Sequence, residues 1–285
     1  MLVPETSYAK ASGGWVAYQT IGTGPADLLI DKPQYFPIDL LWEEPSFLDF
    51  GHGLATFSRA VWFDVRGTGS SDAIDHTEGR LIESNVDDML AVLDDLRCDR
   101  VFVVGLAPSN ALMFAATHPE RTKGLVLINP TVRIRRADDY PAGLSDDSYA
   151  DLVSLVERTW GTGWLTSRFA GTMAQDEAFL RWCARCERLS MTHDEGYWRT
   201  RVVLDLDLRH VLSTIGVPTL VITRAASDRA PQSRYVASHI AGAQTLEFSG
   251  DDSWFADEGA GSSTRSRHSS PEGCSLTMWI GSSRR

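Results

Sequence analysis

The stretch VFVVGLAPSNALMFAATHPERTKGLVLIN, residues 101–129, carries the pattern that decides the fold. Residues 101–105 are apolar up to a glycine, residues 109–118 have the spacing of a helix, and residues 124–129 are again mostly apolar. Short apolar runs separated by a helix are typical of a parallel sheet whose two faces are both covered. We therefore expect two buried parallel strands with a helix between them.

The same alternation extends outward in both directions. Strand-like runs occupy residues 14–21, 27–31, 60–64, 217–223 and 243–248, and helical patterns occupy residues 82–96 and 232–240. Strands that alternate with helices indicate an α/β fold with a mostly parallel central sheet. Residues 131–212 lack strand patterning, so we expect them to form a helical cap over the carboxyl edge of that sheet, where ligands bind in open α/β sheets.

These patterns divide the chain into three parts. The α/β core is expected over residues 8–130 and 213–258, and the cap is inserted between them at residues 131–212. Residues 259–285 are rich in Ser, Gly and Arg and have no apolar period, which predicts a disordered tail. Removal of that tail is then expected to leave the melting temperature unchanged.

Charge and hydropathy restrict the classes of partner and the location. The formal net charge is −11, and most of the tail's charges are positive, so the body is more acidic than the whole chain. Such a body repels phosphate backbones and anionic lipid, and we expect neither a nucleic-acid nor a membrane partner. The first residues, MLVPETSYAK, have no apolar signal segment, and no apolar run approaches the roughly 20 residues of a membrane span. A cytoplasmic location is expected.

The cysteines and histidines give no metal site. Cys183 and Cys186 form one CxxC motif inside a segment of helical periodicity, without a second Cys or His pair nearby. Zinc needs four ligands in a structural site, so two buried helical thiols are the better interpretation. We expect neither a metal nor a cofactor.

Three segments in order resemble the α/β-hydrolase family. FDVRGTGSSD (63–72) resembles a turn common after a strand in that family, residues 103–129 resemble its nucleophile strand, turn and helix, and residues 217–254 resemble its acid-bearing and histidine-bearing end. The phrase LLWEEPSF (40–47) is most similar to α/β-hydrolase-like domains found alone or fused to nucleotide cyclases in actinobacteria. The resemblance implies an α/β-hydrolase fold, with a nucleotide-cyclase domain as one candidate partner.

The resemblance also implies a degenerate catalytic site. The family's nucleophilic serine position falls on Ala107, and the residue that follows it, which gives an oxyanion-hole N–H, is Pro108, which has none. Ser253 stands where the family has its histidine, whereas the acid remains as Asp228. The loop that supplies the second oxyanion donor contains Pro33 and Gln34, with Pro33 where a glycine is expected. Pro108 suits the first turn of the next helix, so we expect the turn to keep the family's shape.

Other residues could replace the missing groups. Ser109 is a candidate for a shifted nucleophile, and His76 and His193 are the candidate bases, although a surface role is the default for every histidine. Trp160, Trp164 and Trp182 either pack the inside of the cap or line an apolar pocket beneath it.

Three functional hypotheses remain open from the sequence. The first is a catalytically impaired hydrolase-fold protein, a pseudoenzyme that binds a small apolar ligand or a partner under its cap. The second is an active esterase with displaced catalytic groups, which depends on analogy of fold. The third is a decayed gene product, suggested by the Ser- and Arg-rich tail in place of a terminal amphipathic helix.

Overall fold

The central sheet forms the frame of the molecule. The computed structural model describes residues 3–74, 80–251 and 277–281. Its eight strands lie in the order β1-β2-β4-β3-β5-β6-β7-β8. The first two pairs, β1 with β2 and β2 with β4, are antiparallel, and every later pair is parallel. The strands are β1 (Thr6–Ala11), β2 (Gly14–Ile21), β3 (Ala26–Asp31), β4 (Ser58–Phe63), β5 (Val101–Gly105), β6 (Thr122–Ile128), β7 (Thr219–Arg224) and β8 (Gln244–Phe248). This arrangement is an α/β-hydrolase fold, as the sequence predicted.

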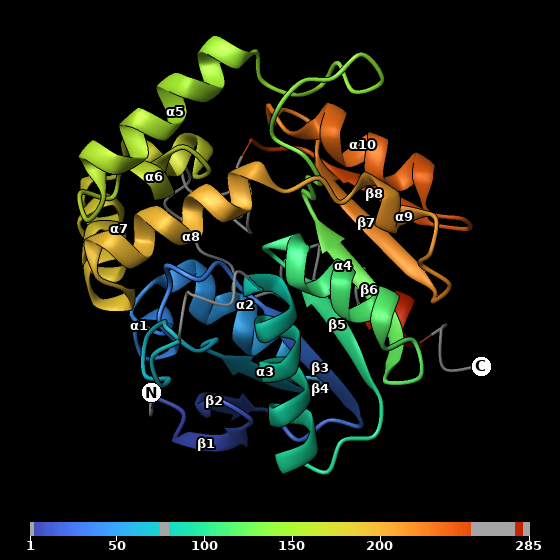
Figure 1. The fold of residues 1–285 in the computed structure, drawn as a ribbon. Coiled ribbons are helices and arrows are strands. Elements are labelled where there is room, and N and C mark those ends of the chain that lie inside the picture. Colours follow the sequence, from blue (N-terminus) through green and yellow to red (C-terminus); the bar gives the residue numbers. More distant parts are fainter. Residues whose placement is uncertain (1–2, 75–79, 252–276, 282–285) are drawn as a thin grey trace.

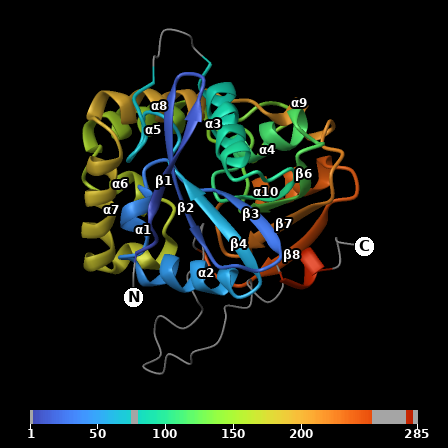
Figure 2. The same cartoon turned by 90° about the horizontal axis from the view of Figure 1, so that it is seen from below.

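Helices cover both faces of the sheet (Figures 1 and 2). Side chains alternate along each strand, so Leu29 and Val103 pack on one face while Ile30 and Val104 pack on the other. The first face is covered by α3 (Leu81–Asp95), α4 (Pro108–Thr117), α9 (Arg209–Leu212) and α10 (Ala230–His239). The second is covered by α1 (Ile38–Leu41), α2 (Pro45–Ala55) and part of α7 (Glu177–Ser190).

The strands and helices expected from periodicity are present with small shifts at their ends. The structure adds β1, which the sequence analysis did not identify. Its residues alternate, but four of the six are exposed or half-buried, as is usual for an edge strand that pairs on one side. Weak apolar content is the reason that the pattern did not reveal it.

Residues 131–212 contribute no strand to the sheet, and Figure 1 shows all their helices except α9, which packs on the first face, above its carboxyl edge. These helices, called the cap helices below, are α5 (Asp146–Thr159), α6 (Trp164–Ser167), the 3-10 helix Gly171–Gln175, α7 and α8 (His193–Asp205). Their starts carry side-chain caps: Ser145 Oγ accepts from Ser148 N, and the Asp176 carboxylate accepts from Ala178 N. Such caps stabilise helices that begin far from the sheet.

Cys183 and Cys186 lie on one face of α7 and are fully buried and free. Burial raises the pKa of both thiols, so they remain protonated and act as small apolar groups. Within residues 3–74, 80–251 and 277–281, no helix is long and apolar enough to cross a membrane.

The C-terminal segment corrects the prediction of a disordered tail. Residues 277–281 are helical, and Trp279 and Ile280 are 6% and 1% exposed. The Trp279 ring meets Phe102 of β5 edge to face, with centroids 6.0 Å apart, and lies over Gly124 of β6. A single turn of helix has no apolar period to detect, which is why the sequence pattern missed this contact. The rest of residues 259–285 lies outside the described residues.

This contact predicts a loss of stability on truncation of one side chain. Trp279→Ala is expected to lower the free energy of unfolding by about 3 kcal/mol and the melting temperature by roughly 6–10 °C, because it leaves a cavity against Phe102 and Gly124. Met278→Ala is the control, because Met278 is 66% exposed. Equal melting temperatures for both variants and the wild type, measured by calorimetry, would contradict the docking of this segment.

Candidate functional site

A cavity of about 630 Å³ lies between the carboxyl ends of the strands and the cap helices. Its floor comes from the segments that follow β3, β5 and β7, through Gln34, Ala107 and Asp228 among others. Its roof comes from α5, α6 and α8, through side chains such as Leu152, Leu155, Trp164 and Val203. This is the position at which open α/β sheets bind their ligands.

The turn between β5 and α4 lies at the floor of this cavity. Ala107 precedes α4 with φ −129° and ψ 90°, which is extended backbone, and its methyl side chain caps nothing. A hydrolase nucleophile sits instead on a sharp, strained turn. Pro108 is the first residue of α4, as expected, and a proline restricts the residue before it to extended conformations. The expectation that the turn keeps the family's shape is therefore wrong at Ala107.

Asp31, the last residue of β3, holds this turn from below. Its carbonyl oxygen accepts from Leu106 N and Ala107 N, at 2.8 and 3.2 Å. Its carboxylate accepts from Ala111 N and from Asn110 Nδ2, both at 3.0 Å. The Asp31 carboxylate thus already accepts a hydrogen bond at the positive end of α4. The Ala107 amide is also occupied and does not serve the cavity.

Burial raises the pKa of Asp31 to about 7, although Asn110 and Ala111 donate to the carboxylate and lower it. The side chain is 1% exposed, so the desolvation of the charge outweighs these bonds. Asp31 is thus a buried group that gains or loses its proton near neutral pH.

The other residues expected at the site divide into three groups. Pro33, Gln34, Pro108 and Asp228 line the cavity. Ser253 and His76 lie outside the described residues. His193 lies on the surface of α8, where Nε2 is 2.7 Å from the Glu157 carbonyl oxygen, and not over the cavity as expected. His193 is the first residue of α8, and this end of the helix lies away from the cavity.

Ser109, the candidate shifted nucleophile, lines the cavity. Among the described residues, no histidine lines the cavity with it. A serine hydroxyl is a weak nucleophile without an adjacent base. The described part of the site therefore contains a hydroxyl but not the group that would activate it.

Of the three tryptophans considered for the pocket, Trp164 lines the cavity and the other two pack elsewhere. Trp182 stacks on Phe36 in the core and donates from Nε1 to the Leu40 carbonyl oxygen at 3.0 Å. Trp160 packs on Gly196 of α8, where a Cβ would lie 2.2 Å from the indole ring. Both alternatives left open by the sequence thus occur, at different residues.

The sequence analysis did not identify the arginines of the cavity. Arg199 of α8 is 2% exposed, pairs with Glu195, and donates to Gln34 Oε1 at 3.0 Å and to the Arg66 carbonyl oxygen at 2.5 Å. It therefore ties the cap to two loops of the core. Arg168 and Arg229 also line the cavity. Arg229 follows Asp228 in the sequence ASDRAP. No sequence pattern distinguishes such an arginine from one on the surface.

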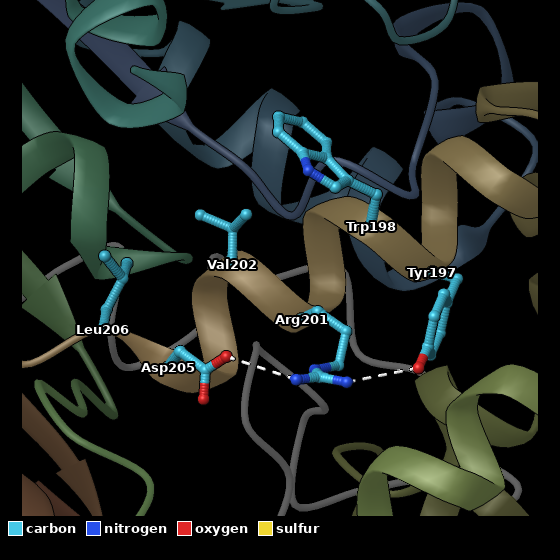
Figure 3. A pocket seen from close by; sticks show the side chains of 6 residues that line it. All are labelled: Tyr197, Trp198, Arg201, Val202, Asp205 and Leu206. Carbon is cyan, nitrogen blue, oxygen red and sulfur yellow. Dashed lines mark hydrogen bonds and ion pairs between the residues drawn. The ribbon is translucent and has the colours of Figure 1, made fainter. Parts of the chain in front are cut away.

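A second hollow, about 540 Å³, lies along the outside of α8 (Figure 3). Its lining residues come from α8 and the residue after it, and Arg201 links Tyr197 Oη at 3.3 Å to Asp205 at 3.7 Å. The charged groups of this hollow contact one another, and Asp205 also accepts from Tyr149 of α5. The cavity under the cap, where several elements converge, is the better candidate for a ligand site.

Comparisons with known proteins agree with the fold. No protein-family model matches the chain. Strigolactone esterase D14 of Arabidopsis thaliana is 29% identical over 196 residues, which are 66% of this chain and 73% of that protein. Karrikin insensitive 2 receptor IA of Petunia hybrida is 24% identical over 198 residues, which are 66% of this chain and 71% of that protein.

Solved structures are similar along nearly the whole chain. The enol-lactonase of Burkholderia xenovorans LB400 matches with a TM-score of 0.70 and 22% identity, over 98% of this chain and 99% of that one. An esterase of Exiguobacterium antarcticum matches with a TM-score of 0.74 and 17% identity, over 99% of this chain and 100% of that one. Together these similarities agree with the α/β-hydrolase fold.

The raised pKa of Asp31 predicts a pH dependence of stability. The folded state holds its proton up to about pH 7, whereas the unfolded chain releases it near pH 4. The folded state therefore binds more protons between these values, and this contribution to the free energy of unfolding falls as pH rises from about 4 to 7. Asp31→Asn, which cannot ionise, is expected to remove that fall in urea titrations at pH 5 and 8.

The comparison between variants isolates this residue, because Asp88 is also buried with a raised pKa and stays in both proteins. An identical change in stability between pH 5 and 8 for the wild type and Asp31→Asn would show that Asp31 does not titrate in this range.

Proposed function

We propose that this chain, a protein of the α/β-hydrolase fold, binds a small molecule in the cavity under its cap and does not hydrolyse it through a serine triad. The observation that carries the proposal is the turn at Ala107 and Pro108. Ala107, which the resemblance assigns to the nucleophile position, carries a methyl group on extended backbone at the floor of a cavity of about 630 Å³.

Two parts of the catalytic machinery are affected by this turn. Ala107 has no group that can attack a carbonyl, and Pro108 has no N–H for an oxyanion. The loss of one oxyanion donor alone costs roughly 3–4 kcal/mol of transition-state stabilisation. With Ser253 at the family's histidine position, the base is a third missing part, and no histidine of the described residues lines the cavity with Asp228. The catalytic impairment of the site is thus the sum of three independent changes.

The binding role rests on what the same site retains. The cavity is open to a ligand, its walls combine apolar cap residues with polar groups of the core, and Arg199 fixes the cap over it. Among the relatives, one carries the name of a receptor and another that of an esterase, so both binding and hydrolysis occur in similar chains. The missing nucleophile favours binding here.

The second candidate is a small-molecule ester hydrolase with displaced groups. Ser109, which faces the cavity, is the observation in its favour. This candidate also needs a base, and the described lining offers carboxylates and arginines but no histidine. We place it second for that reason.

Two further alternatives have less support. The relatives give no support to a nucleotide-cyclase partner, which rests on the resemblance of residues 40–47 and 57–72 alone. A decayed gene product is disfavoured by Trp279 and Ile280, which fill positions in the core. A segment translated in a shifted reading frame would fit the core only by chance.

The experiment is labelling with a fluorophosphonate, which reacts with activated serines. The wild type and Ala107→Ser are expected to remain unlabelled by intact-mass spectrometry and to release p-nitrophenol from p-nitrophenyl esters at the buffer rate. The combination Ala107→Ser, Pro108→Gly and Ser253→His restores nucleophile, donor and base around Asp228. Since triad members act as a unit, labelling and weak esterase activity should appear in the combination alone.

Each result bears on a different part of the proposal. Labelling of the wild type at Ser109 would establish the second candidate. Activity from Ala107→Ser alone would require a base that the proposal denies. A folded but inert triple variant would show that Ser253 does not occupy the family's histidine position.

A further inference from the structure

The charge of the cavity differs from that of the protein. The chain has a net charge of −11, yet the charged groups that line the cavity are four arginines and two aspartates. The arginines are Arg133, Arg168, Arg199 and Arg229, and the aspartates are Asp151 and Asp228. In an acidic protein, arginines that line a cavity are candidates for ligand binding when no carboxylate of the protein pairs with them.

Two of the four arginines are engaged by the protein itself. Arg199 pairs with Glu195, and Arg133 pairs with Asp207. The guanidinium groups of Arg168 and Arg229, in contrast, make no hydrogen bond or ion pair within residues 3–74, 80–251 and 277–281. Two guanidinium groups that face a cavity are thus available to a ligand.

Arg229 is the more constrained of the two. It is half-buried, and its guanidinium carbon lies 4.0 Å from the centroid of the Phe169 ring. The ring covers one face of the guanidinium and leaves the N–H groups on its edge free to donate. Burial is the largest influence on the pKa of Arg229 and lowers it; the Tyr35 phenol and the Asp228 carboxylate raise it, and the positive charge of Arg168 lowers it. Burial thus makes this charge costly to hold, and an anion on the edge of the guanidinium would offset that cost.

The neighbouring groups make no hydrogen bond or ion pair with the Arg229 guanidinium among the described residues. Asp228 is adjacent in sequence, but its carboxylate is exposed and makes no ion pair with Arg229 among the described contacts. Tyr35 is the other polar neighbour, and burial raises the pKa of its phenol, so it remains a neutral hydroxyl that can donate. A ligand at this position would meet two guanidinium groups and one hydroxyl.

We infer that the cavity takes an organic carboxylate, with its carboxylate group on Arg229 and Arg168 and its apolar body against Leu152, Leu155 and Trp164 of the cap helices. A guanidinium edge matches a carboxylate by two parallel N–H···O bonds. This inference rests on the proposed ligand-binding function and refines it, because the ligand expected from the sequence was simply apolar. It predicts a preference for an acid over a neutral analogue of the same shape.

The test compares two probes that differ in charge alone. 1-Naphthaleneacetate and 1-naphthaleneacetamide compete with the fluorescent neutral probe N-phenyl-1-naphthylamine for the cavity. The wild type is expected to bind the acid roughly tenfold to a hundredfold more tightly than the amide, the range for a charge-assisted hydrogen bond. Arg229→Met should abolish that preference while binding of N-phenyl-1-naphthylamine persists, and Arg168→Gln should reduce it.

Arg181→Met is the matched control, because Arg181 lies on the same cap, is 70% exposed and pairs with Glu177 away from the cavity. It removes one positive charge and should keep the preference. Should Arg229→Met fail to fold, Arg168→Gln decides, since Arg168 is exposed.

The outcomes separate this inference from the proposed function. Binding of N-phenyl-1-naphthylamine with equal affinity for acid and amide would overturn the carboxylate site but leave the ligand pocket in place. No binding of any of the three probes would overturn the proposed function itself. An equal loss of preference in Arg181→Met would show that overall charge, not Arg229, attracts the acid.

Discussion

The pyrrolidine ring of Pro108 is the constraint on which the rest of the site depends. It starts α4, removes one backbone donor and restricts Ala107 to extended backbone. Asp31 then fixes the turn from beneath, through two backbone amides and through Ala111 at the helix start. The positive end of α4, which could stabilise an oxyanion, is instead satisfied within the protein. The result is a strand-turn-helix unit without backbone strain at Ala107.

The same constraint leaves the cavity intact. The turn needs no strain, so the floor formed by the segments after β3, β5 and β7 is held by ordinary hydrogen bonds. Above it, Arg199 connects the cap to Gln34 and to the Arg66 backbone, and Arg66 in turn pairs with the buried Asp88. The cap is thus anchored by buried charges, which are costly to separate. A cavity with a hydrogen-bonded floor and an anchored cap is suited to hold a small molecule.

The sequence predicted the parts of this picture that follow periodic patterns. Apolar runs identified seven of the eight strands, and the order of the three family-like segments identified the fold. The assignment of Ala107 and Pro108 to the nucleophile and donor positions comes from the resemblance and stays a prediction, although alanine has no nucleophilic group and proline has no N–H in any fold. Contacts between distant segments were not predictable, because nothing in the local pattern of Arg229, Phe169 or Arg168 shows that they meet. Trp279 was missed for the same reason, since its partners Phe102 and Gly124 lie far away in sequence.

Retention of an intact ester tests the central claim most directly. The wild type is incubated with p-nitrophenyl butyrate, separated rapidly from free ester, and the bound material is extracted and identified by mass spectrometry. The account predicts that the ester is recovered intact from the protein, is displaced by N-phenyl-1-naphthylamine, and breaks down no faster than in buffer. Release of p-nitrophenol above the buffer rate, with butyrate attached to a serine of the protein, would contradict it.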